Sequence, residues 1–78
     1  MGCYYDNVIQ AFEYNEDWSS WAAAKRKKAN YAATNKNCKS KNVIKYYDDA
    51  IFAYESNEDW FSSAAVKSEK ADYAATYI

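Results

Sequence analysis

Apolar residues recur every three or four positions along most of the chain, which is the spacing of one face of an α-helix. One stripe comprises Tyr5, Val8, Ile9 and Phe12, and a later one comprises Val43, Ile44, Tyr47, Ile51 and Tyr54. An Ala-rich segment follows each stripe, and apolar-polar alternation with a period of two never lasts, so strands are not expected. The pattern predicts four helices, near residues 4–14, 16–34, 41–55 and 58–77.

Both Ala-rich segments begin with the same polar signal, Asn-Glu-Asp-Trp, at residues 15–18 and 57–60. Asn15 and Asn57 are residue types that cap helix N-termini, and the carboxylates after them suit the positive end of the helix dipole. We therefore expect the chain to break and restart at these points. Each stripe helix and the Ala-rich helix that follows it should form an antiparallel hairpin.

The chain is an internal duplication. Residues 4–36 align with residues 46–78 at a shift of 42 positions, and 20 of the 33 aligned pairs are identical. A repeat of about 30 to 45 residues has the size of one helical hairpin. We expect one all-α domain over residues 1–78, in which repeat one (4–36), a linker (37–45) and repeat two (46–78) build two tandem hairpins and a compact four-helix domain.

The string YDDAIFAYE, residues 47–55, resembles the second helix of a tetratricopeptide repeat, in which a Tyr-Asp-x-Ala-Ile-x-x-Tyr run is common. The matching string YDNVIQAFE, residues 5–13, shows a weaker likeness. The shift of 42 residues differs from the period of about 34 in that family, and its Leu-Gly pair and closing Pro are missing. The likeness implies helix-hairpin packing, and no function is carried over from it.

Positions that are kept in both copies are expected to serve the hairpin itself. An apolar stripe at helical spacing is usually a packing surface, and rows of Ala let two helix backbones approach closely. The expected core residues are Ile9, Phe12, Trp18, Ile51, Tyr54 and Trp60. A repeated ion pair between helices is also expected, joining Glu13 to Lys25 and Glu55 to Lys67 at the rim of the core.

Positions that differ between the copies are free to serve a function. Four large side chains occur in one copy only: Tyr14 aligns with Ser56, Trp21 with Ser63, Phe52 with Gln10 and Phe61 with Ser19. Phe52 is expected on the polar face of its helix, where an exposed ring needs a contact to justify it. Because aromatic residues are enriched at interfaces, we predict that Tyr14, Trp21, Phe52 and Phe61 contact a partner.

Trp21, Lys25, Arg26, Lys27 and Lys28 form an aromatic and basic stretch in the first copy only. Such stretches can bind phosphate groups and stack on bases, although a solvated basic face is the commoner meaning. We predict that these residues, too, contact the partner. Residues 1–45 carry eight Lys or Arg against four Asp or Glu, and residues 46–78 carry two against seven. The net charges of +4 and −5 sum to the chain's −1, and this polarity favours a charged partner or head-to-tail pairing.

Several function classes are not expected. The chain contains no His, and no nucleophile lies in a pattern with a base, so we expect neither an enzyme nor a cofactor. Cys3 and Cys38 should lie at the same end of the first hairpin, where they either form a disulfide or stay reduced, and two Cys without His make a poor metal site. With no apolar run of about 18 residues and no secretory leader, we expect a cytoplasmic protein and no membrane partner.

These observations lead to three hypotheses. The first is a small protein-binding module, such as an inhibitor, immunity protein or adaptor, that occupies a surface of a larger protein or protein complex. A composition rich in Lys, Asn, Tyr and Ile suggests A/T-rich coding, as in a phage or another mobile element. The alternatives are nucleic-acid binding through Trp21 and residues 25–28, and self-assembly, for example as a homodimer, because two hairpins are few for a repeat array.

Overall fold

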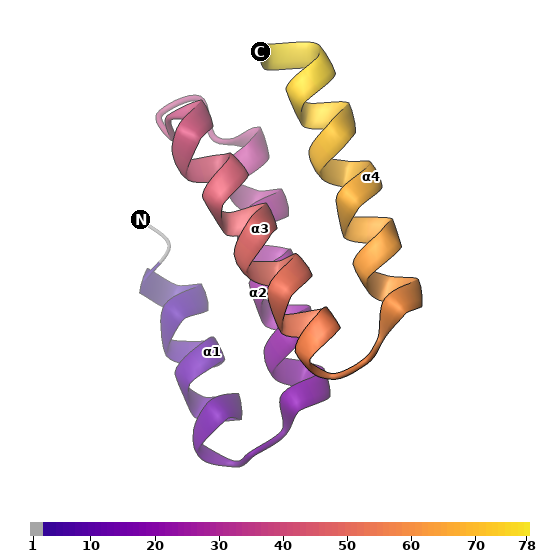
Figure 1. Cartoon of the computed structure of the whole chain (residues 1–78). Coiled ribbons are helices and arrows are strands. Elements are labelled where there is room, and N and C mark those ends of the chain that lie inside the picture. The colour runs from indigo at the N-terminus through magenta and orange to yellow at the C-terminus, as the bar shows by residue number, and fades with distance from the viewer. Residues whose placement is uncertain (1–2) are drawn as a thin grey trace.

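The computed structural model of the chain describes the backbone of residues 3–78 and the side chains from residue 4 onward. Its helices are α1 (Cys3–Tyr14), α2 (Trp18–Thr34), α3 (Ser40–Ser56) and α4 (Trp60–Tyr77), as Figure 1 shows. The described residues contain no strand, and the predicted all-α class with four helices is confirmed. Residues 35–39 connect α2 to α3, so residues 40–45 of the predicted linker belong to a helix.

The N-caps of α2 and α4 are aspartates. The carboxylate of Asp17 accepts a hydrogen bond from the backbone N–H of Ser20 at 3.3 Å, and that of Asp59 accepts one from Ser62 at 3.1 Å. A capping side chain bonds the N–H two or three residues after it. The prediction that Asn15 and Asn57 cap these helices is therefore wrong, because both helices begin two residues later than expected.

The two hairpin turns have the same backbone conformation. Glu16 has a φ of 54° and Glu58 a φ of 57°, which is the left-handed region that residues with a Cβ rarely adopt. Each glutamate immediately precedes the aspartate that caps the next helix. The duplicated Asn-Glu-Asp sequence thus reverses the chain in the same way in both copies.

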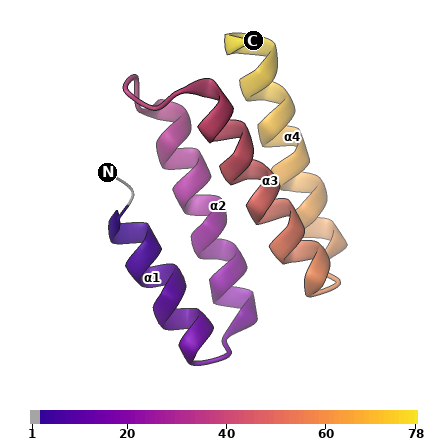
Figure 2. The ribbon, with the colours of Figure 1, turned by 60° about the vertical axis from the view of Figure 1, so that its left-hand side comes forward.

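The four helices form an open array in which extensive packing occurs only between neighbours in the sequence, α1 with α2, α2 with α3, and α3 with α4. Figure 2 shows them side by side in chain order. The chain is compact, with a radius of gyration of 12.0 Å, but its dimensions of 35 × 27 × 13 Å are those of a slab. As a result α2 and α3 each have a helix on two sides, whereas α1 and α4 lie at the edges.

Both hairpins repeat the same side-chain contacts. Lys28 Nζ lies 2.6 Å from Asp6 Oδ1 in the first hairpin, and Lys70 Nζ lies 2.7 Å from Asp48 Oδ1 in the second. These four residues are two pairs of equivalent positions, 42 residues apart. Tyrosine rings also meet at equivalent places, since Tyr5 packs on Tyr31 and Tyr47 on Tyr73 at centroid distances of 5.7 and 6.2 Å.

The core lies where α3 meets its two neighbours. Its buried members are Ala22, Ala29, Ala32, Val43, Tyr47, Ala50, Ile51, Ala53, Tyr54, Val66 and Tyr73. The core predictions for Ile51 and Tyr54 are confirmed, because α3 is covered on both sides. Ile9 and Phe12, their counterparts on α1, are only half-buried, because α1 has a single neighbouring helix.

The core predictions for Trp18 and Trp60 are wrong. Trp18 is 41% exposed and Trp60 is 61% exposed, although both stand on the Ala-rich face of their helix. Each is the first residue of its helix and directly follows the hairpin turn, where the neighbouring helices leave much of the indole uncovered. The close contact between α2 and α3 is instead made by small residues, with Ala22, Ala29 and Ala50 fully buried.

One of the two predicted Glu-Lys ion pairs is present. Glu55 Oε2 lies 3.1 Å from Lys67 Nζ and accepts a hydrogen bond from Ser63 Oγ at 3.0 Å. The hydrogen bonds from Lys67 and Ser63 favour the charged carboxylate and hold the pKa of Glu55 below its ordinary value of 4.5. No ion pair joins Glu13 and Lys25 among the described residues, where the first repeat has Trp21 in place of Ser63.

This difference predicts an acid sensitivity that belongs to the second repeat. Because the pKa of Glu55 is lower in the folded chain, its contribution to stability is present above about pH 4.5 and is lost as the pH falls through the folded value. Glu55→Gln should therefore reduce the fall in the free energy of unfolding below that pH, as measured by urea titration at a series of pH values. Glu13→Gln is the matched control, and an equal effect from it would contradict the assignment.

Candidate protein-binding surface

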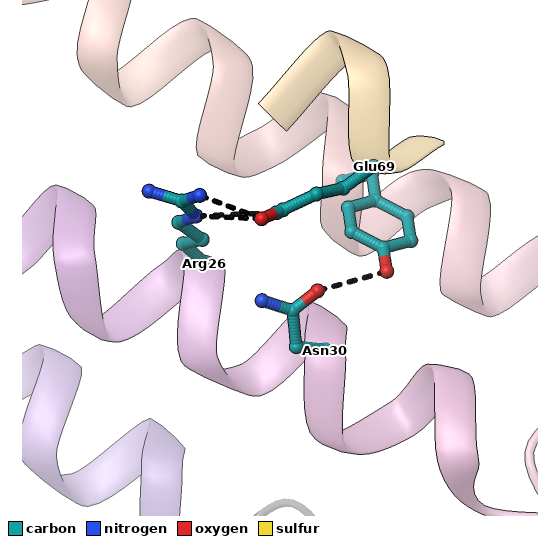
Figure 3. A network of polar contacts seen from close by, with 4 residues as sticks. Arg26, Asn30 and Glu69 are labelled. Carbon is teal, nitrogen blue, oxygen red and sulfur yellow. Dashed lines mark hydrogen bonds and ion pairs between the residues drawn. The ribbon is translucent and has the colours of Figure 1, made fainter. Parts of the chain in front are cut away.

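Arg26 is one of the predicted partner contacts, but in the structure it forms an ion pair within the chain. Its Nε and Nη2 donate to the carboxylate of Glu69 on α4, with Nε–Oε1 at 3.1 Å and Nη2–Oε2 at 2.6 Å. Figure 3 shows this fork of contacts from α2 to α4. The hydrogen bond to Glu69 raises the pKa of Arg26 above its already high value. The pair thus links the first hairpin to the second.

A neutral hydrogen bond lies beside this ion pair. The hydroxyl of Tyr47 on α3 donates to Oδ1 of Asn30 on α2 at 2.9 Å, and Figure 3 shows Asn30 one helical turn from Arg26. Burial raises the pKa of Tyr47, since the phenolate would lose hydration. Together these contacts hold α2, α3 and α4 in one arrangement.

Two of the other three basic residues of α2 also contact side chains of the same chain. Lys28 pairs with Asp6 and lies over the ring of Tyr46, 4.3 Å from its centroid. Lys25 is half-buried over the ring of Trp21, again at 4.3 Å from the centroid. Lys27 is exposed. The basic residues of α2 therefore do not form a continuous exposed basic face. The structure adds nothing in favour of nucleic-acid binding.

Trp21 belongs to the packing of the chain. Its ring is half-buried against the core cluster and meets Trp18 edge to face, with 5.3 Å between the centroids. Its indole Nε1 is buried without a hydrogen-bond partner among the described residues. Its absence from the second repeat therefore reflects a different way of packing the hairpin, in which Ser63 bonds to Glu55 instead.

The other three predicted contact residues are exposed. Phe61 is 88% exposed, Tyr14 is 83% exposed and Phe52 is 68% exposed. They do not form one patch. Phe52 follows Asp48 by one helical turn, so the two side chains lie on the same side of α3. This side faces α4, because Asp48 forms an ion pair with Lys70 of that helix. Phe61 precedes Lys70 by nine positions, half a revolution around α4, and therefore points away from that side.

A cavity of about 530 Å³ lies at the connection between α2 and α3. Its lining includes Lys28, Tyr31, Lys39, Lys41, Asn42 and Tyr46. Cys38 also lines it, half-buried and without a disulfide to any side chain that the structure describes. The side chain of Cys3 lies outside the described residues, so a disulfide between the two stays a prediction. The polar run at residues 35–42 was the sequence signal for this feature, although the sequence predicts only a linker there.

Within the part of the chain that the structure describes, no three His, Cys, Asp or Glu side chains are grouped so that they could hold a metal ion. None of the described helices is both long enough and apolar enough to cross a membrane. Comparison with known proteins finds no matching family model, no similar curated protein and no similar solved structure.

Proposed function

We propose that this chain is a small non-enzymatic protein-binding module that anchors on a larger protein or protein complex through Phe52. The observation that carries the proposal is the 68% exposure of this ring on α3, at a position where the first repeat has Gln10. Hairpin packing therefore does not require a phenyl group there. A protruding aromatic side chain of this kind fills a pocket on a partner and supplies much of the binding energy.

The residues around Phe52 indicate the chemistry of the partner. Asp48 and Glu55, which lie one turn on either side of the ring, are paired with Lys70 and Lys67 of α4, and Asp49 is exposed three residues before it. Charged groups of both signs therefore border the ring. A complementary partner would offer an apolar pocket with a polar rim that can bond to groups of both signs.

Occupying a partner's surface needs no catalytic group, and it is how inhibitors, immunity proteins and adaptors act. The A/T-rich character of the composition supports an origin in a phage or another mobile element, with the host cytoplasm as the place of action. Phe61 lies on another side of the second hairpin, so one small contact area cannot use both rings.

Affinity capture from the cell of origin, read by quantitative mass spectrometry, tests this proposal. Phe52→Gln introduces the residue of the first repeat and should lower the recovered partner by at least about tenfold, the loss typical of a binding hot spot. Phe61→Ser, the matching change on α4, should leave recovery unchanged. A partner that is retained by Phe52→Gln, or lost only with Phe61→Ser, would show that Phe52 is not the anchor.

A further inference from the structure

We propose that copies of this chain associate head to tail, with α4 of one copy packed against α1 of the next, as α2 packs against α3 within the chain. In the duplication α4 is the counterpart of α2, and α1 is the counterpart of α3. The α2–α3 contact is therefore a template for a contact between α4 and α1 of a second copy. This inference goes beyond the proposed function and uses other residues.

The first observation is that α4 carries the docking face of α2 with no helix on it. Ala22 and Ala29 are fully buried under α3, whereas their identical counterparts Ala64 and Ala71 are exposed. The same side of α4 also holds three further exposed residues, Trp60, Ala75 and Ile78. An Ala stripe does not by itself define a site. Here, however, α2 carries the same Ala positions and α3 covers them, which shows the kind of helix that would cover the stripe on α4.

The second observation is that α1 carries the matching face of α3. Ala50 and Ala53 are fully buried against α2, while their counterparts Val8 and Ala11 are exposed. Tyr4, the counterpart of the half-buried Tyr46, is 83% exposed. Each edge of the array thus presents counterparts of residues that are buried at the internal interface, with Val8 on α1 in place of Ala50.

The polar contacts between the repeats have counterparts as well. Nδ2 of Asn57 donates to the backbone carbonyl of Trp18 at 2.8 Å, and the equivalent positions hold Asn15 and Trp60, the same residue types. In the proposed contact Asn15 of the next copy would donate to the carbonyl of Trp60. A hydrogen bond of this kind fixes the register of the two helices.

Lys28 lies over the ring of Tyr46 across the internal interface, and the equivalent positions hold Lys70 and Tyr4, again the same types. Lys70 of one copy is therefore placed to approach Tyr4 of the next, a cation–π contact that would cover an otherwise exposed ring.

The Tyr47–Asn30 hydrogen bond has Tyr5 and Asp72 at the equivalent positions. An aspartate carboxylate accepts a hydrogen bond from a hydroxyl at least as well as an amide oxygen does. The Arg26–Glu69 pair is not reproduced, since the equivalent positions hold Ser68 and Lys27.

The orientation follows from the non-identical faces, because α4 carries the face of α2 and α1 carries the face of α3. The two contacting helices carry little net charge, since α1 holds Asp6 and Glu13 without a basic residue and α4 holds two lysines against two acidic residues, so the repeated contacts set the orientation. Arrays of stacked repeats usually end in polar faces and need about three repeats to bury their surfaces, and this chain has two repeats with apolar edges.

Two variants that each block one edge test the proposal. Ala71→Arg blocks α4 and Ala11→Arg blocks α1, and both positions are exposed in the single chain, so each variant should keep the helical circular dichroism of the wild type. In sedimentation equilibrium from about 10 μM to about 1 mM the wild type should rise above 9.0 kDa. Each variant should weaken self-association by at least about tenfold, because Arg cannot fit between helices in Ala contact.

Mixing the variants gives the decisive result. Ala71→Arg keeps a free α1 and Ala11→Arg keeps a free α4, so the equimolar mixture should form a dimer although each variant alone stays monomeric. Ser19→Arg, an exposed control on α2, should assemble like the wild type, and so should Phe52→Gln, which separates this test from that of the partner. A wild type that remains monomeric, or a dimer formed by either edge variant alone, would overturn the head-to-tail arrangement.

Discussion

Replacing Ala29 with Arg should remove a large part of the protein's stability, while the same change at Ala71, its counterpart in the second repeat, should leave the stability nearly unchanged. Ala29 is fully buried where α2 meets α3, whereas Ala71 is exposed on the edge helix α4. A guanidinium forced into the internal contact must lose hydration without a partner or push the helices apart, at a cost of about 3 to 5 kcal/mol. A domain of 78 residues has only about 4 to 12 kcal/mol of stability in total.

Urea denaturation followed by circular dichroism at low micromolar concentration measures this difference without a contribution from self-association. Ala71→Arg should change the free energy of unfolding by no more than about 0.5 kcal/mol, as is usual for exposed positions. Equal losses at the two positions would mean that the face of α4 is covered within a single chain. Equal tolerance would mean that α2 and α3 do not pack as described.

Tyr54→Ala should destabilise the protein far more than Trp60→Ala. Tyr54 is 6% exposed on α3, and removing a buried aromatic ring costs about 3 to 5 kcal/mol through lost contacts and the cavity left behind. Trp60 is 61% exposed at the start of α4, so its removal should cost about 1 kcal/mol or less in the isolated chain. Chemical denaturation of both variants at low protein concentration gives the two values, and a Trp60→Ala loss as large as that of Tyr54→Ala would contradict the observed burial.

The helices and the duplication could be predicted because both depend on local or directly readable properties. The helical spacing of apolar residues shows which side of each helix is buried, and it does so without knowledge of the neighbouring helix. The sequence pattern starts the second helix of each hairpin two residues before its observed first residue, because Asn15 and Asp17 are both good caps and the choice depends on the turn. In the structure Glu16 adopts a positive φ, which leaves Asp17 as the residue that caps α2.

The candidate site was predicted only in part. Comparison of the two repeats correctly identified Phe52 and Phe61 as side chains that the core does not need, since both are exposed. The same comparison could not place Arg26, because its partner Glu69 lies 43 residues away and no local pattern links them. Trp21 likewise differs between the repeats for a packing reason, which becomes visible only when its half-buried ring is seen against the core.

The sequence by itself determined the helical class, the four segments and the existence of two equivalent hairpins, because periodicity and internal identity are written in the order of residues. Only the tertiary structure decided which of two identical residues is buried. Ala29 and Ala71 have the same chemistry and stand in near-identical segments, yet one is covered by α3 and the other faces water. Burial depends on which helix lies alongside, and an array of four helices has two inner members and two edges that no single repeat can reveal.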